Sequence, residues 1–61
     1  MNVLLSGGPA SGYKDTNPVI KRSRGRTYII VRLNETDYRY EPSGKRAIEM
    51  GLSFAEYIFV R

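Results

Sequence analysis

The sequence contains no cysteine and no histidine, and these two absences exclude several classes of small protein. Without cysteine, the disulfide framework that holds many small secreted domains together cannot form. Zinc sites of the usual Cys and His type are excluded as well. So are the common nucleophile–base pairs that use histidine or cysteine. We therefore expect a protein that is not an enzyme and that uses no metal or cofactor.

Long hydrophobic runs are also missing. The only apolar stretch near the N-terminus is Val3-Leu4-Leu5, which has no basic residues before it. It is too short for a signal peptide or a membrane span. We therefore expect a cytoplasmic protein that does not bind a membrane.

The length of 61 residues leaves room for one domain, which we expect to span residues 1–61. A domain of this size buries only about 60% of the surface that its unfolded chain exposes, so its stability is low. Small domains often gain stability from disulfides, a metal or a partner subunit. With disulfides excluded, and with open sheet edges to cover, we expect a homo-oligomer or a complex with a protein partner.

What the sequence does contain is a set of strand patterns. In residues 27–34 the side chains alternate between two faces and are rich in β-branched types, which predicts a strand. Residues 3–5 predict a short strand, and residues 18–21 the start of another, with Pro18 at its first position. Residues 6–18 are rich in Gly, Pro, Ser and Asn, which predicts a flexible loop.

The C-terminal half predicts two hairpins. Residues 38–41 would pair with the strand at 27–34, and Pro42-Ser43-Gly44 would close that hairpin. Residues 45–61 allow two structures. Ser53-Phe54-Ala55-Glu56 matches a capping box, which would open a short helix. The aromatic and β-branched end of the chain favours instead a hairpin with strands at 46–50 and 54–60 and a turn around Gly51-Leu52.

These elements predict an all-β fold, a small antiparallel meander of four or five strands that is barrel-like or pairs as a dimer. The alternative is an α+β fold with a short C-terminal helix. The expected core consists of apolar and aromatic side chains on the inward faces of the strands: Val3, Leu5, Ile29, Val31, Leu33, Tyr40, Ile48, Phe54, Ile58 and Val60. Tyr13 in the loop would cap the edge of this core or face a partner.

A basic segment is the first candidate site. The formal net charge is +4, and Lys21, Arg22, Arg24 and Arg26 lie within six residues, with Arg32 further along. In an extended chain, the three arginines of this segment project to one side. Guanidinium groups suit phosphate oxygens, and Tyr28 and Tyr38 could stack on exposed bases. This pattern predicts contact with nucleic acid or another polyanion, and a solvated turn is the structural alternative.

The glycine loop is the second candidate site. Ser6, Gly7 and Gly8 follow an apolar strand, as in loops whose backbone N–H groups bind a phosphate. The Gly-Lys-Ser/Thr residues of a P-loop do not follow. The pattern predicts either a structural turn or a weak site for a small anion or nucleotide.

Two stretches of the chain resemble a known group of proteins. Residues 2–10 and 37–44 are similar to those of a family of very small, uncharacterised actinobacterial proteins. That family shares an opening Leu-Leu-x-Gly-Gly-Pro and a central Tyr/Phe-Glu-Pro-Ser/Thr-Gly. The resemblance implies a cytoplasmic bacterial accessory protein and assigns no active residue.

Three functional hypotheses follow from the sequence. The leading one is a non-enzymatic binding module that engages a protein partner, or itself, through a sheet edge, which requires no special motif. The second is nucleic-acid or polyanion binding through residues 21–26. The third is binding of a small anion or nucleotide by the loop at residues 6–12.

Overall fold

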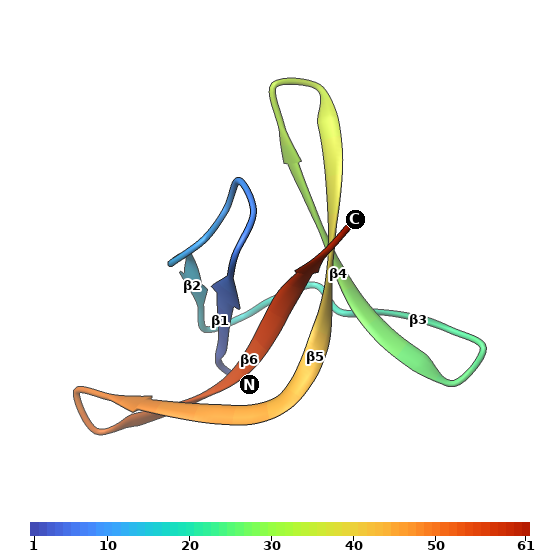
Figure 1. Ribbon diagram of the computed structural model, residues 1–61. Coiled ribbons are helices and arrows are strands. Elements are labelled where there is room, and N and C mark those ends of the chain that lie inside the picture. The colour runs from blue at the N-terminus through green and yellow to red at the C-terminus, as the bar shows by residue number, and fades with distance from the viewer.

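The computed structural model describes residues 1–61 as one mixed sheet of six strands (Figure 1). The strands in chain order are β1 (Val3–Ser6), β2 (Lys14–Asp15), β3 (Lys21–Ser23), β4 (Arg26–Leu33), β5 (Thr36–Glu49) and β6 (Leu52–Val60). Their order across the sheet is β2-β1-β6-β5-β4-β3. The all-β prediction is confirmed. The sheet has more strands than expected, however, and it is not closed into a barrel, because β2 and β3 are edges that do not pair with each other.

Two-residue turns join β3 to β4, β4 to β5, and β5 to β6, and they point in three different directions (Figure 1). Both residues of each turn have positive φ, as a type I′ hairpin turn requires. The three pairs are Arg24-Gly25, Asn34-Glu35 and Met50-Gly51. The first of these turns, at Arg24-Gly25, lies within the basic segment. No helix of the structure is long and apolar enough to cross a membrane.

Strand β5 is much longer than predicted. Pro42-Ser43-Gly44 was expected to end it, but the strand continues to Glu49 through an irregularity between Pro42 and Arg46. Gly44 has a φ of 87° in this irregularity. A bulge of this kind bends a strand and changes which face its side chains occupy, without ending the pairing. The turn-forming residues thus bend the sheet here rather than close a hairpin.

The C-terminal hairpin is confirmed, and the helical alternative is wrong. The turn lies one residue earlier than predicted, at Met50-Gly51, and β6 pairs with β5 on one side and with β1 on the other. The β1–β6 pair is parallel and joins Val3 to Ala55. Two partner strands stabilise β6 more than an isolated short helix would be stabilised in water. The parallel pair also makes the sheet mixed, whereas a purely antiparallel meander was expected.

The predictions for the N-terminal third hold in part. The strand at residues 3–5 is confirmed and extends to Ser6. The segment after it is mainly loop, but β2 forms within it and pairs with β1. The strand predicted from Pro18 begins only at Lys21.

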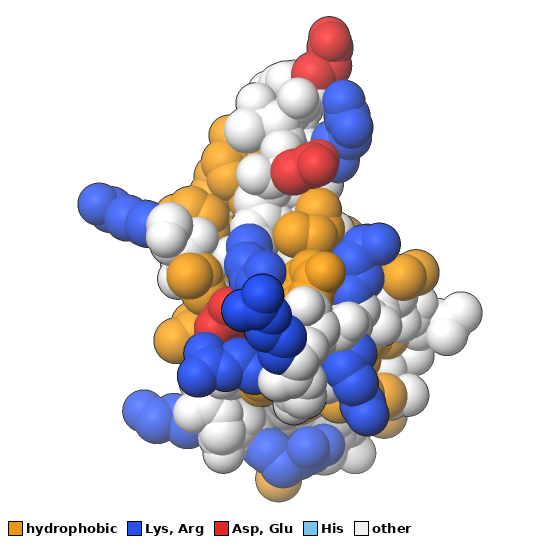
Figure 2. All heavy atoms as spheres, turned by 90° about the vertical axis from the view of Figure 1, so that its right-hand side faces the viewer, with side chains coloured by type: hydrophobic (Ala, Val, Ile, Leu, Met, Phe, Trp, Pro, Cys, Tyr) orange, Lys and Arg blue, Asp and Glu red, His pale blue; other side chains and the backbone are white.

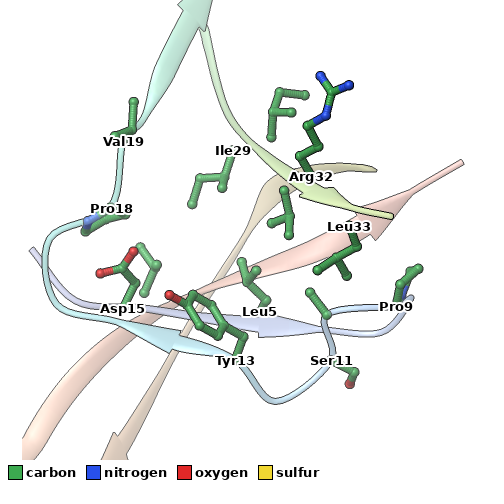
Figure 3. A pocket seen from close by; sticks show the side chains of 14 residues that line it. Leu5, Pro9, Ser11, Tyr13, Asp15, Pro18, Val19, Ile29, Arg32 and Leu33 are labelled. Atoms are coloured by element: carbon green, nitrogen blue, oxygen red, sulfur yellow. The ribbon is translucent and has the colours of Figure 1, made fainter. Parts of the chain in front are cut away.

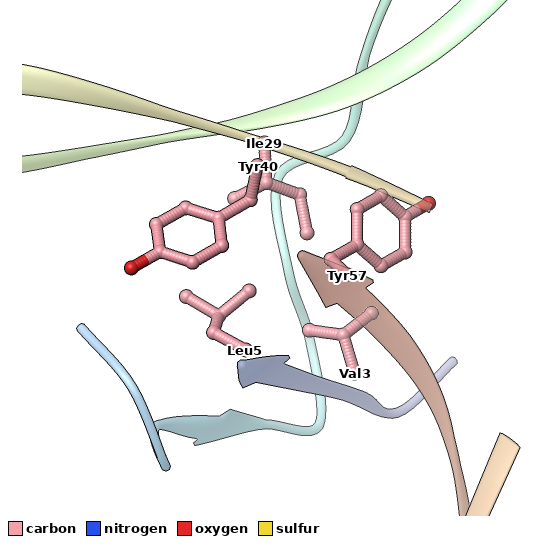
Figure 4. Packing of buried hydrophobic residues seen from close by; sticks show 5 residues of the cluster. All are labelled: Val3, Leu5, Ile29, Tyr40 and Tyr57. Atoms are coloured by element: carbon pink, nitrogen blue, oxygen red, sulfur yellow. The ribbon is translucent and has the colours of Figure 1, made fainter. Parts of the chain in front are cut away.

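The core lies on one face of the curved sheet and is centred on Tyr40 (Figure 4). It contains five buried residues from four strands: Val3, Leu5, Ile29, Tyr40 and Tyr57. Phe54, another predicted core residue, is also buried but lies outside this cluster. The centre of its ring lies 6.0 Å from Lys14 Nζ.

Other predicted core residues lie outside this cluster. Val31 and Val60 are half-buried, whereas Leu33, Ile48 and Ile58 are exposed, so the core prediction was wrong for these three. Ile58 alternates with the buried Tyr57 and therefore points to the opposite face of the sheet, which no second layer covers. Ile48 lies near the tip of the β5–β6 hairpin, beyond the packed part of the sheet.

Candidate functional site

Strand β4 pairs with β3 over its first part and with β5 over the rest. Its first residues, Arg26 to Tyr28, pair with β3 on one side. Residues 29–33 pair with β5, and no strand pairs with their other side. This second half of β4 is an open edge within the sheet, and we call residues 29–33 the open edge of β4.

The hairpin register identifies which backbone groups this open edge presents. In a two-residue hairpin, the residues next to the turn form a hydrogen-bonded pair, and such pairs then alternate along the strands. Leu33, Val31 and Ile29 therefore direct their backbone groups toward β5. Ile30 and Arg32 direct their N–H and C=O groups away from β5, to the unpaired side.

A pocket of about 690 Å³ lies along this open edge (Figure 3). Nine of the 14 residues that line it are hydrophobic. Figure 3 shows Tyr13, Pro18 and Val19 on one side of the pocket, Ile29 and Leu33 on the other, and Leu5 between them. Tyr13 is 56% exposed, so it contributes to the pocket wall without being part of the core.

The segment before β3 leaves this edge open. If β3 extended backwards in its register with β4, Val19 would lie opposite Ile30 and Pro18 opposite Val31. The chain from Pro18 to Ile20 forms no strand, however. This segment instead borders the pocket, where Val19 is 76% exposed.

The glycine loop is fixed to the core by the hydroxyl of Tyr40. This hydroxyl donates to the carbonyl oxygen of Gly7 at 2.7 Å and accepts from the N–H of Ala10 at 2.9 Å. Gly8 has a φ of 65°, and a Cβ on it would lie 2.5 Å from Phe59 Cγ. The glycines therefore permit a tight turn against the core.

The polar group of Ser6 is also used within the fold. The carboxylate of Glu56 accepts from Ser43 Oγ at 2.7 Å and from Ser6 Oγ at 3.0 Å. These two hydrogen bonds, with that of Ser43 the stronger influence, lower the pKa of Glu56 below its ordinary value. A negative charge beside Ser6 repels a bound anion, so we do not carry the anion-binding hypothesis forward.

The basic segment forms a hairpin, so its arginines do not share one face as an extended chain would require. Arg22 lies opposite Thr27, whereas Lys21 lies opposite Tyr28 and Arg26 opposite Ser23. Residues opposite each other share a face, and neighbours in a strand do not. Lys21 and Arg26 therefore lie on one face and Arg22 on the other.

Arg24 lies in the turn of this hairpin, and Arg32 lies on the open edge of β4. Arg32 has Asp37 as a distant ionic partner at 3.9 Å. No carboxylate lies within ion-pair distance of the four cations of residues 21–26. These four cations therefore have no ionic partner within the protein, and they are divided between the two faces and the turn of the hairpin.

Both tyrosines that were predicted to stack on bases are in contact with other side chains. The guanidinium of Arg39 lies 4.0 Å from the ring centre of Tyr28, and Arg39 Nε donates to Glu41 at 2.8 Å. Tyr38 is half-buried, and its ring centre lies 6.1 Å from that of Phe59. The structure therefore does not bring these rings together with the basic segment as a free stacking surface.

Charge is distributed unevenly along β4. Figure 2 shows acidic side chains at the top of the molecule, over the β4–β5 turn, and mainly basic side chains below them. Glu35 and Asp37 belong to the acidic end, and residues 21–26 belong to the basic end. The open edge of β4 runs between these two ends.

Sequence reasoning missed this pocket and its open edge. The one available signal was Pro18, which precedes the β-branched residues Val19 and Ile20 beside the basic segment. The fold and the site together define a single-layer all-β domain with an unpaired strand segment beside an apolar pocket. In comparisons with protein-family models, curated proteins and solved structures, the chain gives no match.

Proposed function

We propose that this protein is a binding module that takes up an extended segment of a partner protein as an added strand on the open edge of β4. The observation that carries this proposal is the coincidence of unpaired backbone groups at Ile30 and Arg32 with an apolar pocket along the same five residues. Strand addition uses both features, because backbone hydrogen bonds provide affinity and the pocket selects side chains.

The geometry of an added strand fits the pocket. A new strand would lie about 4.8 Å from β4 and would exchange hydrogen bonds with Ile30 and Arg32. Alternate side chains of that strand would point to the face that holds Ile29, Val31 and Leu33. Since this is the face that carries the core, apolar side chains there would enter the pocket.

The charge of the protein favours a different partner over a second copy of itself. Each chain has a formal net charge of +4, so two copies that met edge to edge would repel each other. Arg32 lies on the open edge, and four further cations lie beside its first residue. An acidic or neutral segment therefore suits this edge better than β4 of another copy, and self-association becomes an outcome of the test.

The proposal is tested by removing one outward N–H. In Ile30→Pro the N–H that faces the open side is lost, while the hydrogen bonds between β4 and β5 remain. Ile30→Val changes the side chain but keeps the N–H, so it is the matched control. Each variant is used to select binders from random heptapeptide libraries, and selected peptides are titrated by fluorescence polarisation. We expect Ile30→Val to bind like the natural protein and Ile30→Pro to lose at least about tenfold in affinity.

A second variant tests the pocket without altering β4. Val19→Asp places a carboxylate on the exposed wall across the pocket from the open edge, where Val19 makes no strand pairing. We expect this variant to bind apolar peptides more weakly and to have the same melting temperature as the natural protein. Peptides that bind all three variants equally, or libraries that yield no binder, would contradict strand addition at this edge. Dimers of the natural protein that Ile30→Pro converts to monomers would assign the edge to self-association instead.

A further inference from the structure

We infer, on the basis of the proposed function, that the bound segment is the free C-terminal end of a partner protein, antiparallel to β4. Its terminal carboxylate would lie at the basic end of the open edge, beside Lys21 and Arg22. Two features of the structure carry this inference. The first is that β3 blocks the edge at one end, and the second is the distribution of charge along the edge.

Strand β3 lies on the same side of β4 as the open edge, and Lys21 pairs with Tyr28 there. An added strand would therefore lie in line with β3. It cannot continue past Tyr28, because the protein's own chain occupies that position. Ile20 packs against the core, so the first free position lies opposite Ile30. The bound segment must end, or leave the plane of the sheet, at this point.

The direction of the added strand decides which end of a peptide meets this block. An antiparallel strand would place its C-terminus there, and a parallel strand would place its N-terminus there. Lys21 and Arg22, the first residues of β3, have no carboxylate partner. They attract a terminal carboxylate and repel a terminal ammonium group. The antiparallel direction with a free C-terminus is therefore favoured.

The opposite end of the edge supports the same direction. Glu35 and Asp37 lie at the β4–β5 turn, where the upstream part of an antiparallel peptide would pass. Figure 2 shows acidic side chains at this end of the molecule and basic side chains toward the β3–β4 hairpin. A peptide whose charge becomes more negative toward its C-terminus complements the charges at the two ends of the edge.

The register also specifies the side chains. A last residue opposite Ile30 would share the face of Ile30, which is opposite to the face that carries the core. The second-last and fourth-last residues would lie opposite Val31 and Leu33, on the face that carries the core. We therefore expect apolar residues at the second-last and fourth-last positions of the bound peptide.

Two display libraries test this inference without a known ligand. One presents random heptapeptides with a free C-terminus, and the other presents the same heptapeptides followed by a fixed flexible tail. We expect binders only from the first library, with apolar residues at the two positions named above. A selected peptide is then synthesised as the free acid and as the C-terminal amide, and we expect the amide to bind about tenfold more weakly.

A double variant locates the carboxylate. In Lys21→Ala with Arg22→Ala we expect the free acid to bind about tenfold more weakly and its advantage over the amide to disappear. The matched control is Lys45→Ala with Arg46→Ala, which removes the same charge from the β5–β6 hairpin. We expect the control to keep the preference for the free acid.

The outcomes separate this inference from the proposed function. Binders that come only from the tailed library, or an amide that binds as tightly as the acid, would overturn the C-terminal inference. If Ile30→Pro abolished the binding of those tailed or amidated peptides, the proposal of strand addition would still hold. Failure of both libraries would overturn the proposed function and this inference together.

Discussion

Tyr40 is the residue on which most of this small core depends. Its side chain is fully buried, its ring centre lies 5.6 Å from that of Phe59, and its hydroxyl makes both hydrogen bonds to the glycine loop. Because that loop leads into the segment that borders the pocket, Tyr40 connects the core to the candidate site. A single phenolic hydroxyl therefore has a structural role that alternation along a strand does not indicate.

We predict that Tyr40→Phe lowers the free energy of unfolding by about 0.5–1.5 kcal/mol, because it removes the part-buried hydrogen bonds that the hydroxyl makes with Gly7 and Ala10. The measurement is urea denaturation followed by circular dichroism. Tyr57→Phe is the matched control, since Tyr57 is equally buried in the same cluster but its hydroxyl makes no hydrogen bond within the protein. Equal losses in both variants would contradict a specific role for the Tyr40 hydroxyl.

Glu56 gives a prediction on pH dependence. The hydroxyls of Ser43 and Ser6 lower its pKa in the folded state from the ordinary value of 4.5. A lowered pKa contributes stability that is fully present above the unfolded-state value and is lost as the pH falls through the folded-state value. We therefore expect the stability advantage of the natural protein over Glu56→Gln to be constant above about pH 5 and to shrink below pH 4.5.

The measurement for Glu56 is a series of thermal melts of both proteins between pH 7 and pH 3. Glu41→Gln is a suitable comparison, because Glu41 lies on the neighbouring strand β5 and pairs with Arg39. An advantage of the natural protein that persists unchanged at the lowest pH would contradict the contribution of the Glu56 carboxylate.

At the scale of elements, the three hairpins differ in how well their residues suit their turns. Asn34 and the glycines tolerate positive φ, but Arg24, Glu35 and Met50 adopt it as well. For residues other than glycine and asparagine, this conformation costs about 1–2 kcal/mol. Met50 is fully exposed, so no packing compensates for the cost at that turn.

We predict that Met50→Asn raises the free energy of unfolding by about 0.5–1 kcal/mol. The change produces the Asn-Gly sequence that type I′ turns prefer, at a φ of 51°. Urea denaturation provides the measurement. Ile48→Asn is the control, because it also replaces an exposed apolar residue of this hairpin but at an extended position, where asparagine is disfavoured. A gain in both variants would point to an effect of surface polarity rather than of the turn.

Most strands could be predicted from the sequence, because their signals are local. The alternation at residues 27–34, the glycines of the turns and the aromatic C-terminal segment each act within a few residues. The continuation of β5 through Pro42 could not be predicted, since its cause is pairing with β6 on both sides of the bulge. The parallel pairing of β1 with β6 joins residues about 50 positions apart, and no local pattern reports it.

At the scale of the whole molecule, the sheet is a single layer with one packed face. Only six residues are buried, and no element covers the opposite face. The net charge of +4 is therefore spread over a surface that is large for the mass of the protein. Four of its cations, at residues 21–26 of the β3–β4 hairpin, have no carboxylate partner.

This distribution predicts only weak, nonspecific contact with nucleic acid. We expect single-stranded oligonucleotides to be bound at low salt, with an affinity that falls steeply as salt increases, because phosphate contacts release counterions. Replacing Arg22, Arg24 and Arg26 together by alanine should flatten this dependence. Fluorescence anisotropy over a salt series provides the measurement, and sequence-specific binding that survives physiological salt would favour the nucleic-acid hypothesis over peptide docking.

The sequence predicted some residues of the candidate site but not their arrangement. The cations at residues 21–26 and the exposed Tyr13 were identified from composition and position, and both lie beside the pocket. The basic side chains of residues 21–26 lie on two faces because the turn at Arg24-Gly25 places them on two paired strands. The pocket itself depends on β1, β4 and the segment at residues 13–19 meeting in space.

The sequence by itself determined the class of this protein. Alternating β-branched residues made it all-β. The lack of cysteine and histidine excluded disulfides, zinc sites of the Cys and His type, and nucleophile–base pairs that use these residues. Only the tertiary structure decided which strand is left unpaired and what lies beside it. The physical reason is that side-chain alternation is a local property of the chain, whereas an open edge is defined by the strands that fail to reach it. In this protein, residues 18–20 form no strand, and one side of residues 29–33 of β4 is left unpaired.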